Sequence, residues 1–376
     1  WHQRRRKPVP HLLFCKCRTQ RTPAYRLSIA TAVARAISII CRNEVCRSGA
    51  DRIIKRHKKS PSFKRRGLSC GKGWQIMDAA LMKSGILIFL IVLGYLLKRA
   101  GLFHQEDSKV LSNIMLYVTL PAVLVNAFRS FTLDVHLLSF ILLGLLANVI
   151  LLVVGWRVGA RETPLVHAMY MICLAGYNIG SFCIPFVQNL FPHRMMEVVL
   201  FDIGNSIINC GVAYTFARMQ MEPGSRFRLW PMVKTLFSTY PFNLYIGLLA
   251  LSLMHVSFPE PLYQLADTVA AANPVVVMLM LGIMFEVRLG PAERHQVLGI
   301  VTSRVLTEAV MAALLIWLLP FPLEQRLIAA LLVCAPISGM ATVFCGKLQC
   351  DPSVYGTATS LTIPISIAVM LGLSLF

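Results

Sequence analysis

The sequence predicts an all-α integral membrane protein with ten transmembrane helices. Hydrophobic residues make up 56% of the 376 residues and charged residues only 14%, whereas a soluble globular protein carries about 25% charged residues. From Met77 onward, long apolar runs follow one another, and no connection between them is long enough to form a soluble domain.

Each predicted span is a mostly apolar run of about the 20 residues that a transmembrane helix requires. The ten runs lie at 79–97, 109–128, 136–156, 165–188, 196–218, 233–255, 262–285, 297–319, 326–346 and 353–375. Several runs contain proline, which membrane helices tolerate where neighbouring groups satisfy the freed backbone. These prolines are Pro121, Pro185, Pro241, Pro274, Pro336 and Pro364.

The first 76 residues differ sharply from the rest. They hold 20 of the 37 Lys and Arg residues but only two acids, Glu44 and Asp51. Because the first methionine after Trp1 is Met77, we expect 1–76 to be upstream sequence translated in frame, or disordered, and dispensable for membrane insertion. The alternatives are an organelle transit peptide and a basic arm for nucleic acid or anionic lipid. Since the surplus charge is confined to this segment, we expect no nucleic-acid partner for the membrane unit.

The sequence contains no motif of catalysis or cofactor binding. Its eleven cysteines include no CxxC pair, and Cys173, Cys183, Cys210, Cys334 and Cys345 fall in apolar runs, where a cysteine is typically a small buried hydrophobe. The histidines form no HExxH pattern, and GxSxG, Walker and GxGxxG sequences are absent. We therefore expect no metal site, no cofactor and no enzymatic activity.

Basic residues indicate which side of the membrane each connection faces. The connections after the odd-numbered spans, with their flanks, carry 13 Lys and Arg residues, including Arg304 and Lys347, whereas the opposite side carries four. Positive residues mark the cytoplasmic side, so both termini of 77–376 are predicted to lie outside. Arg304 also precedes Glu308 by one helical turn, which predicts an ion pair near the cytoplasmic end of span 8.

Segments in four spans carry a family resemblance. They are Val110–Asn113 with Thr119–Ala122 in span 2, Gly176–Pro185 in span 4, Leu281–Phe285 in span 7 and Cys334–Thr342 in span 9. Together, in this order, they resemble the auxin efflux carrier family, whose bacterial members include malonate and malate permeases. The resemblance covers the whole of 77–376.

This resemblance implies two five-helix repeats of inverted topology, 77–219 and 233–376, joined by a cytoplasmic linker at 220–232. It implies helices that are broken near their middle in spans 4 and 9. It also implies secondary transport of a small organic anion, a carboxylate, by alternating access and driven by a proton or sodium gradient. The location would be the cell membrane, in bacteria the inner membrane, and the family allows a homodimer.

Polar and small residues within four spans are the candidates for substrate and ion binding. They are Asn178, Gly180, Ser181 and Pro185 in span 4, Asp202, Asn205 and Asn209 in span 5, Asn273 in span 7, and Pro336, Ser338 and Thr342 in span 9. The three residues of span 5 recur at i, i+3 and i+7, so they share one helix face. A carboxylate within a span costs about 2.5–3.5 kcal/mol on insertion scales, which favours a position facing a cavity or a partner.

Asp202 is the candidate coupling residue. Burial disfavours the charged form of a carboxylate, so a proton relay can be built on such a group, and a nearby sodium ion would instead favour the ionised form. The structural alternative is an interhelical hydrogen bond from span 5 to Thr359, Thr362 or Ser366 of span 10. For the prolines and glycines of spans 4, 7 and 9, the alternative is a packed helix kink.

Two other functions fit part of the sequence. One is a sodium-coupled carrier of the bile-acid symporter type, which replacing sodium by choline during uptake would distinguish. The other, from a different class, is an intramembrane enzyme, for which Asp202 and Glu308 are the candidate acidic pair.

The predicted orientation gives a labelling prediction. Cys350 follows Lys347 on the predicted cytoplasmic side, so an impermeant thiol reagent should modify it from that side only. Labelling of Cys350 in intact cells would reverse the orientation.

Overall fold

The computed structural model describes residues 70–129, 135–221, 229–287, 290–291 and 293–374. The chain separates into two units, Trp1–Lys64 and Arg65–Phe376, and all described residues belong to the second. Residues 1–69 of the predicted leader and 222–228 of the predicted linker therefore lie outside the described residues.

Every regular element of the described residues is helical, and they contain no strand. The α-helices are α2 (Cys70–Arg99), α3 (Ser108–Ile114), α4 (Leu120–Phe128), α5 (Val135–Val158), α6 (Pro164–Leu174), α7 (Ile184–Leu190), α8 (Met195–Ile207), α9 (Ala213–Met221), α10 (Leu229–Phe237), α11 (Tyr240–Leu253), α12 (Glu260–Ala270), α13 (Asn273–Met284), α14 (Arg294–Leu318), α15 (Leu323–Val333), α16 (Gly339–Lys347) and α17 (Pro352–Ser374). Three π-helical turns connect some of them: η2 (Met115–Thr119), η4 (Ile179–Cys183) and η6 (Ile208–Val212). Each predicted run coincides with one helix or with consecutive helical segments.

Six helical stretches among the described residues are long and apolar enough to cross a membrane. They are Gln105–Phe128, His136–Arg161, Pro192–Met221, Glu260–Met284, Arg294–Leu318 and Pro352–Leu373, which match predicted spans 2, 3, 5, 7, 8 and 10. Predicted spans 4, 6 and 9 are divided into shorter helices, and predicted span 1 lies in α2. The prediction of an all-helical, multi-pass membrane protein is therefore confirmed.

Some of the span prolines lie in the first turn of a helical segment, whereas Pro336 lies at an interruption. Pro121 follows η2 at the start of α4, and Pro185 follows η4 at the start of α7. Proline has no N–H to donate and its ring clashes with a carbonyl of the preceding turn, which a wider π-helical turn relieves. Span 4 is instead interrupted upstream, at 175–178, where Gly176 has a φ of +94° that favours glycine. Pro185 therefore lies one helical segment beyond the interruption of this span.

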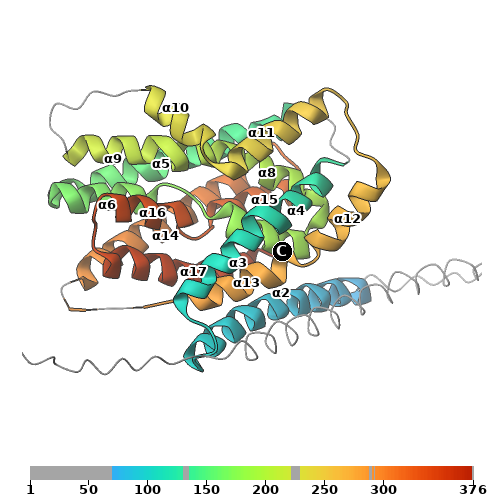
Figure 1. Cartoon of the computed structure of the whole chain (residues 1–376), viewed down its shortest axis with the longest axis horizontal. Coiled ribbons are helices and arrows are strands. Elements are labelled where there is room, and N and C mark those ends of the chain that lie inside the picture. Colours follow the sequence, from blue (N-terminus) through green and yellow to red (C-terminus); the bar gives the residue numbers. More distant parts are fainter. Residues whose placement is uncertain (1–69, 130–134, 222–228, 288–289, 292, 375–376) are drawn as a thin grey trace, which may run out of the picture. The chain divides into compact units, whose positions relative to one another are not determined.

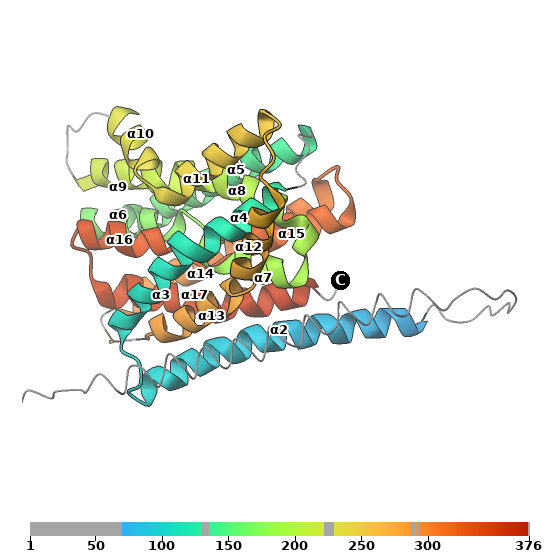
Figure 2. The ribbon, with the colours of Figure 1, turned by 45° about the vertical axis from the view of Figure 1, so that its right-hand side comes forward.

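Figure 1 and Figure 2 show how the helices pack around the two divided spans. In both views α2 runs along α13, and α5 lies beside α8. A Cβ atom at Gly282 would overlap the backbone of Ile91, and one at Gly204 would overlap that of Ile141. Glycine at these positions lets the helix backbones approach closely, as is common in membrane proteins.

Three helices form the interior of the unit. Nearly every residue of α8 is buried, as are the last eight residues of α6 and the last six of α15. The outer helices instead expose large apolar side chains such as Phe89, Leu146 and Trp317, which suits a surface that faces lipid. The interrupted spans 4 and 9 therefore lie at the centre of the packing.

Two residues that were assigned to the predicted cytoplasmic surface are buried in the structure. Arg304 is 0% exposed, so it does not flank a span, and twelve of the thirteen basic residues are left to support the orientation. Cys350 is only 4% exposed, and its N–H donates to the carbonyl of Cys345. Its burial removes the basis for labelling it, so the labelling test requires exposed positions instead.

We predict that cysteines introduced at two exposed positions will report the orientation. Lys347 and Leu323 are exposed at opposite ends of span 9. In a background with the five cysteines of 1–70 replaced by serine, Lys347→Cys should react with an impermeant thiol reagent only after permeabilisation. Leu323→Cys should react in intact cells. The reverse pattern, measured by mass shift, would place the termini of 77–376 in the cytoplasm.

Candidate functional site

The two central interruptions meet. Residues 175–178 separate α6 from η4, and residues 334–338 separate α15 from α16. Tyr177 and Ile337 form an antiparallel β-bridge, and the N–H of Asn178 donates to the carbonyl of Pro336 at 3.0 Å. The interruptions of spans 4 and 9 therefore cross here, with Pro336 at this crossing and Pro185 in the helix that follows η4.

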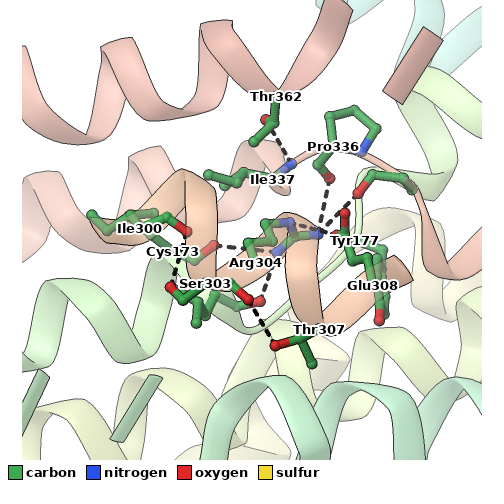
Figure 3. Close-up of polar contacts among 12 residues, drawn as sticks. Cys173, Tyr177, Ile300, Ser303, Arg304, Thr307, Glu308, Pro336, Ile337 and Thr362 are labelled. Atoms are coloured by element: carbon green, nitrogen blue, oxygen red, sulfur yellow. Dashed lines mark hydrogen bonds and ion pairs between the residues drawn. The ribbon is translucent and has the colours of Figure 1, made fainter. Parts of the chain in front are cut away.

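Arg304 of α14 binds the backbone of both interrupted spans (Figure 3). Its Nη1 donates to the carbonyls of Leu174 at 2.6 Å and Cys173 at 3.3 Å. Its Nη2 donates to the carbonyls of Ala335 at 3.0 Å and Pro336 at 3.4 Å. The last carbonyls of a helix have no partner within the helix, so one guanidinium satisfies the C-terminal end of α6 and also binds two carbonyls of the segment that follows α15.

Two further residues complete the surroundings of this guanidinium. Glu308 lies one turn along α14, with its Oε1 2.7 Å from Arg304 Nε, and the guanidinium carbon lies 5.2 Å from the centre of the Tyr177 ring. The predicted pair of Arg304 and Glu308 is confirmed, but its predicted place near a membrane surface is wrong. Both side chains are buried against the crossing, because α14 packs on α15 and α6.

The polar face of span 5 is directed at the same crossing. Asn205 Oδ1 accepts from the N–H of Tyr177 at 2.9 Å, and its Nδ2 donates to the Tyr177 carbonyl at 3.0 Å and to Asp202 Oδ1 at 2.7 Å. Asn209 Nδ2 donates to Ser338 Oγ at 2.8 Å. The predicted stripe on span 5 therefore binds the interruption of span 4 through Asn205 and that of span 9 through Asn209.

Asp202 has a partner that the sequence did not indicate. The hydroxyl of Tyr245, in α11, donates to Asp202 Oδ2 at 2.6 Å, and both side chains are buried. The expected alternative partners in span 10 are thus wrong for Asp202. Thr362 of that span instead accepts from the N–H of Ile337 at 3.2 Å. Tyr245 lies in no recognisable sequence motif. It reaches Asp202 because α11 packs on α8.

Small residues line the first turns that follow the two interruptions. In η4, Gly180 and Ser181 are half-buried, and a Cβ atom at Gly180 would stand 3.9 Å from Asp202 Oδ2. In α16, Ser338 Oγ accepts from the N–H of Met340 at 3.2 Å, and Gly339 is exposed. Thr342 Oγ1 donates to the Gly339 carbonyl of its own helix.

Asn273 belongs to a different polar cluster. It is fully buried at the start of α13, where its Oδ1 accepts from Thr119 Oγ1 at 2.8 Å and its Nδ2 donates to Gln188 Oε1 at 3.2 Å. This cluster joins span 7 to spans 2 and 4. The structure therefore does not bring Asn273 together with the residues that bind the crossing.

The two acids proposed for an enzyme have separate partners. Asp202 binds Tyr245 and Asn205, whereas Glu308 pairs with Arg304. Within the described residues, no group of His, Cys, Asp and Glu side chains has the arrangement of a metal site. The geometry thus gives no catalytic dyad.

Ion pairs join connections of the two halves on the predicted outer side. Arg194, between spans 4 and 5, donates to Glu324 at the start of α15 and lies 3.0 Å from the buried Glu197. Arg129, after span 2, pairs with Glu260 at the start of α12. The hydrogen bond from Arg194 lowers the pKa of Glu324 from 4.5 to about 2.

We predict that Glu324 stabilises the fold only above acidic pH. Because its pKa is lower in the folded than in the unfolded chain, its contribution is complete above pH 4.5 and disappears as the pH falls towards 2. The side chain is 41% exposed, so solvent limits the effect to about 1 kcal/mol or less. Glu324→Gln should lower the melting temperature at neutral pH by up to roughly 2–4 °C, and this difference from wild type should vanish near pH 2.

Glu106→Gln is the matched control, because Glu106 is exposed and makes no ion pair with a described residue. It should leave the melting temperature unchanged at every pH. A Glu324→Gln difference that persists unchanged down to pH 2 would contradict the prediction.

One comparison with known families gives a match. Residues 80–234 match the family described as "Membrane transport protein", which is of the auxin efflux carrier type and is the family that the motifs resemble. No curated protein matches the chain. The matched region contains α6, η4, α7 and α8, which supply the span 4 interruption and the Asp202 face. Through this region the chain is similar to a family of membrane transport proteins.

Proposed function

We propose that this chain is a secondary active transporter that carries a small organic anion, a carboxylate, by alternating access driven by an ion gradient. The observation that carries the proposal is the meeting of two interrupted helices beside a buried carboxylate. Tyr177 and Ile337 bridge the interruptions, and Asp202 adjoins the turn that follows one of them. Transporters with discontinuous helices bind substrate and coupling ion at such places.

The helix contacts support ten spans in two inverted repeats, 77–219 and 233–376. In an inverted repeat, each span of the first repeat corresponds to the span five positions later, so a contact between two spans of the first repeat should recur between their counterparts. Helices α5 and α8 of spans 3 and 5 pack together, and so do α14 and α17 of spans 8 and 10. Likewise, α6 packs on α9, and its counterpart α15 packs on α17. Five is an odd number, so the second repeat enters the membrane from the opposite side.

The first turn of α16 is the proposed contact for the anion. The N-terminus of a helix carries a partial positive charge and unpaired N–H groups, which favour anions. Apart from its chain neighbours and the backbone of its own helix, no described atom lies within 4 Å of the place that a Cβ of Gly339 would take. This open space next to Ser338 allows a ligand to approach the backbone directly.

Asp202 is the proposed coupling group. An ionised carboxylate repels a substrate carboxylate that binds at the same crossing, most strongly where water is excluded. A proton on Asp202 removes this repulsion, so substrate and proton would bind together. The contacts of Asp202 with Asn205, and of Asn205 with the backbone of Tyr177, connect this event to the interruption of span 4.

We predict that the purified chain in proteoliposomes will accumulate a labelled dicarboxylate such as malonate or malate when an ion gradient is imposed. The neutral diamide of the same acid should not be taken up, because it lacks the charge that a helix N-terminus attracts. Uptake should collapse when an ionophore dissipates the gradient. Absence of uptake and of counterflow for every carboxylate tested would overturn the proposed substrate class.

We predict that Asp202→Asn will fold but lose coupling. The amide oxygen can accept from Asn205, and the amide nitrogen can donate to the Tyr245 hydroxyl after that hydroxyl rotates. Uptake should fall by about tenfold or more, which corresponds to roughly 1.4 kcal/mol, and the remaining rate should no longer depend on pH. The control is Asp351→Asn, because its side chain accepts from the N–H of Ser353 outside the crossing and an amide preserves that bond. Wild-type rate and pH dependence in well-expressed Asp202→Asn protein would make Asp202 structural.

A further inference from the structure

Four backbone carbonyls converge on a single cation inside the protein. They belong to Cys173 and Leu174 at the end of α6 and to Ala335 and Pro336 after α15, and they lie 2.6–3.4 Å from the two terminal nitrogens of Arg304. The C-terminal end of a helix carries a partial negative charge. The end of α6 therefore faces the segment that follows α15, and Glu308 Oε1 lies 2.7 Å from Nε of the same guanidinium.

Such a group of oxygens is what a monovalent cation requires. In transporters with discontinuous helices, unwound backbone carbonyls and half-helix C-terminal ends coordinate the coupling cation. In this chain the Arg304 side chain, which is fully buried, already occupies that position. A guanidinium is far larger than a sodium ion and holds these four carbonyls at hydrogen-bond distance, so it leaves them no role as sodium ligands.

We propose that Arg304 is a tethered cation, which takes the place of an exchangeable sodium ion at the crossing of spans 4 and 9. The cation cannot dissociate during the transport cycle, since it is part of α14. The exchangeable charge is then carried on the other side of the crossing, where Asp202 lies. This inference deepens the proposed function, because it removes sodium from the crossing as a coupling ion.

Removing the guanidinium should uncover the cation site. Arg304→Ala leaves the four carbonyls and the Glu308 carboxylate buried around a space that a guanidinium or sodium ion can fill. Loss of one partner of a buried ion pair is strongly destabilising, so the melting temperature should fall by roughly 5–10 °C. A ligand that binds only the folded state raises the melting temperature again.

The test is a thermal-unfolding series on the purified full chain in detergent, in choline chloride, in sodium chloride, and in choline chloride with millimolar guanidinium. The wild type should give one melting temperature in all three media. Arg304→Ala should be stabilised by guanidinium, and by sodium relative to choline. Arg326→Ala is the matched control, because Arg326 donates to a single carbonyl, that of Ile316, and should show no such response.

Two outcomes would overturn the proposal. One is an Arg304→Ala protein whose melting temperature is the same in all three media. The other is a wild type that sodium stabilises relative to choline, which decides the matter even if Arg304→Ala does not fold. In that case Arg304→Lys and Arg304→Met supply a further comparison, in which the charged lysine should be the more stable. Because unfolding is measured without substrate, these outcomes are independent of whether the chain transports a carboxylate.

Discussion

The rest of the structure depends on one constraint. Two helices stop inside the membrane unit, and their free backbone N–H and C=O groups need hydrogen-bond partners. A lipid bilayer offers no water to unpaired N–H and C=O groups, so interrupted helices persist only where protein groups replace it. Here the replacements come from four directions: the bridge between Tyr177 and Ile337, the Arg304 guanidinium, the Asn205 amide and the Thr362 hydroxyl. The burial of α6, α8 and α15 follows, because these helices must surround the crossing.

The C-terminal and N-terminal helix ends at the crossing have different surroundings. The C-terminal ends of α6 and α15 are neutralised by a cation that belongs to the chain. The N-terminal ends that follow the interruptions carry small residues, and the exposed Gly339 leaves open space at one of them. An exchangeable ligand is therefore offered positive helix ends and not negative ones, which agrees with an anionic substrate.

The sequence predicted what local patterns determine and missed what packing determines. Apolar runs located the six helical stretches that are long enough to cross a membrane, and the i, i+3, i+7 spacing placed Asp202, Asn205 and Asn209 on the face that binds the crossing. Tyr245 was missed because its contact with Asp202 depends on how α11 packs, which no spacing encodes. Arg304 was assigned to a helix end, although an arginine so deep in an apolar run is itself a sign of a buried partner. Pro185 did not locate the interruption, because proline suits the first turn of a helix as well as an interruption.

Tyr177 joins the two halves of the site. Its backbone N–H and carbonyl are both held by Asn205, whose amide also binds Asp202, and its ring lies beneath the Arg304 guanidinium. A change of charge on Asp202 alters the hydrogen bond from Asn205, and Asn205 cannot shift without moving the backbone of Tyr177. That backbone is one side of the bridge to Ile337. The proposed proton binding at Asp202 is thereby linked through three residues to the position of one interrupted helix against the other, whereas the Arg304 guanidinium holds backbone carbonyls of both spans.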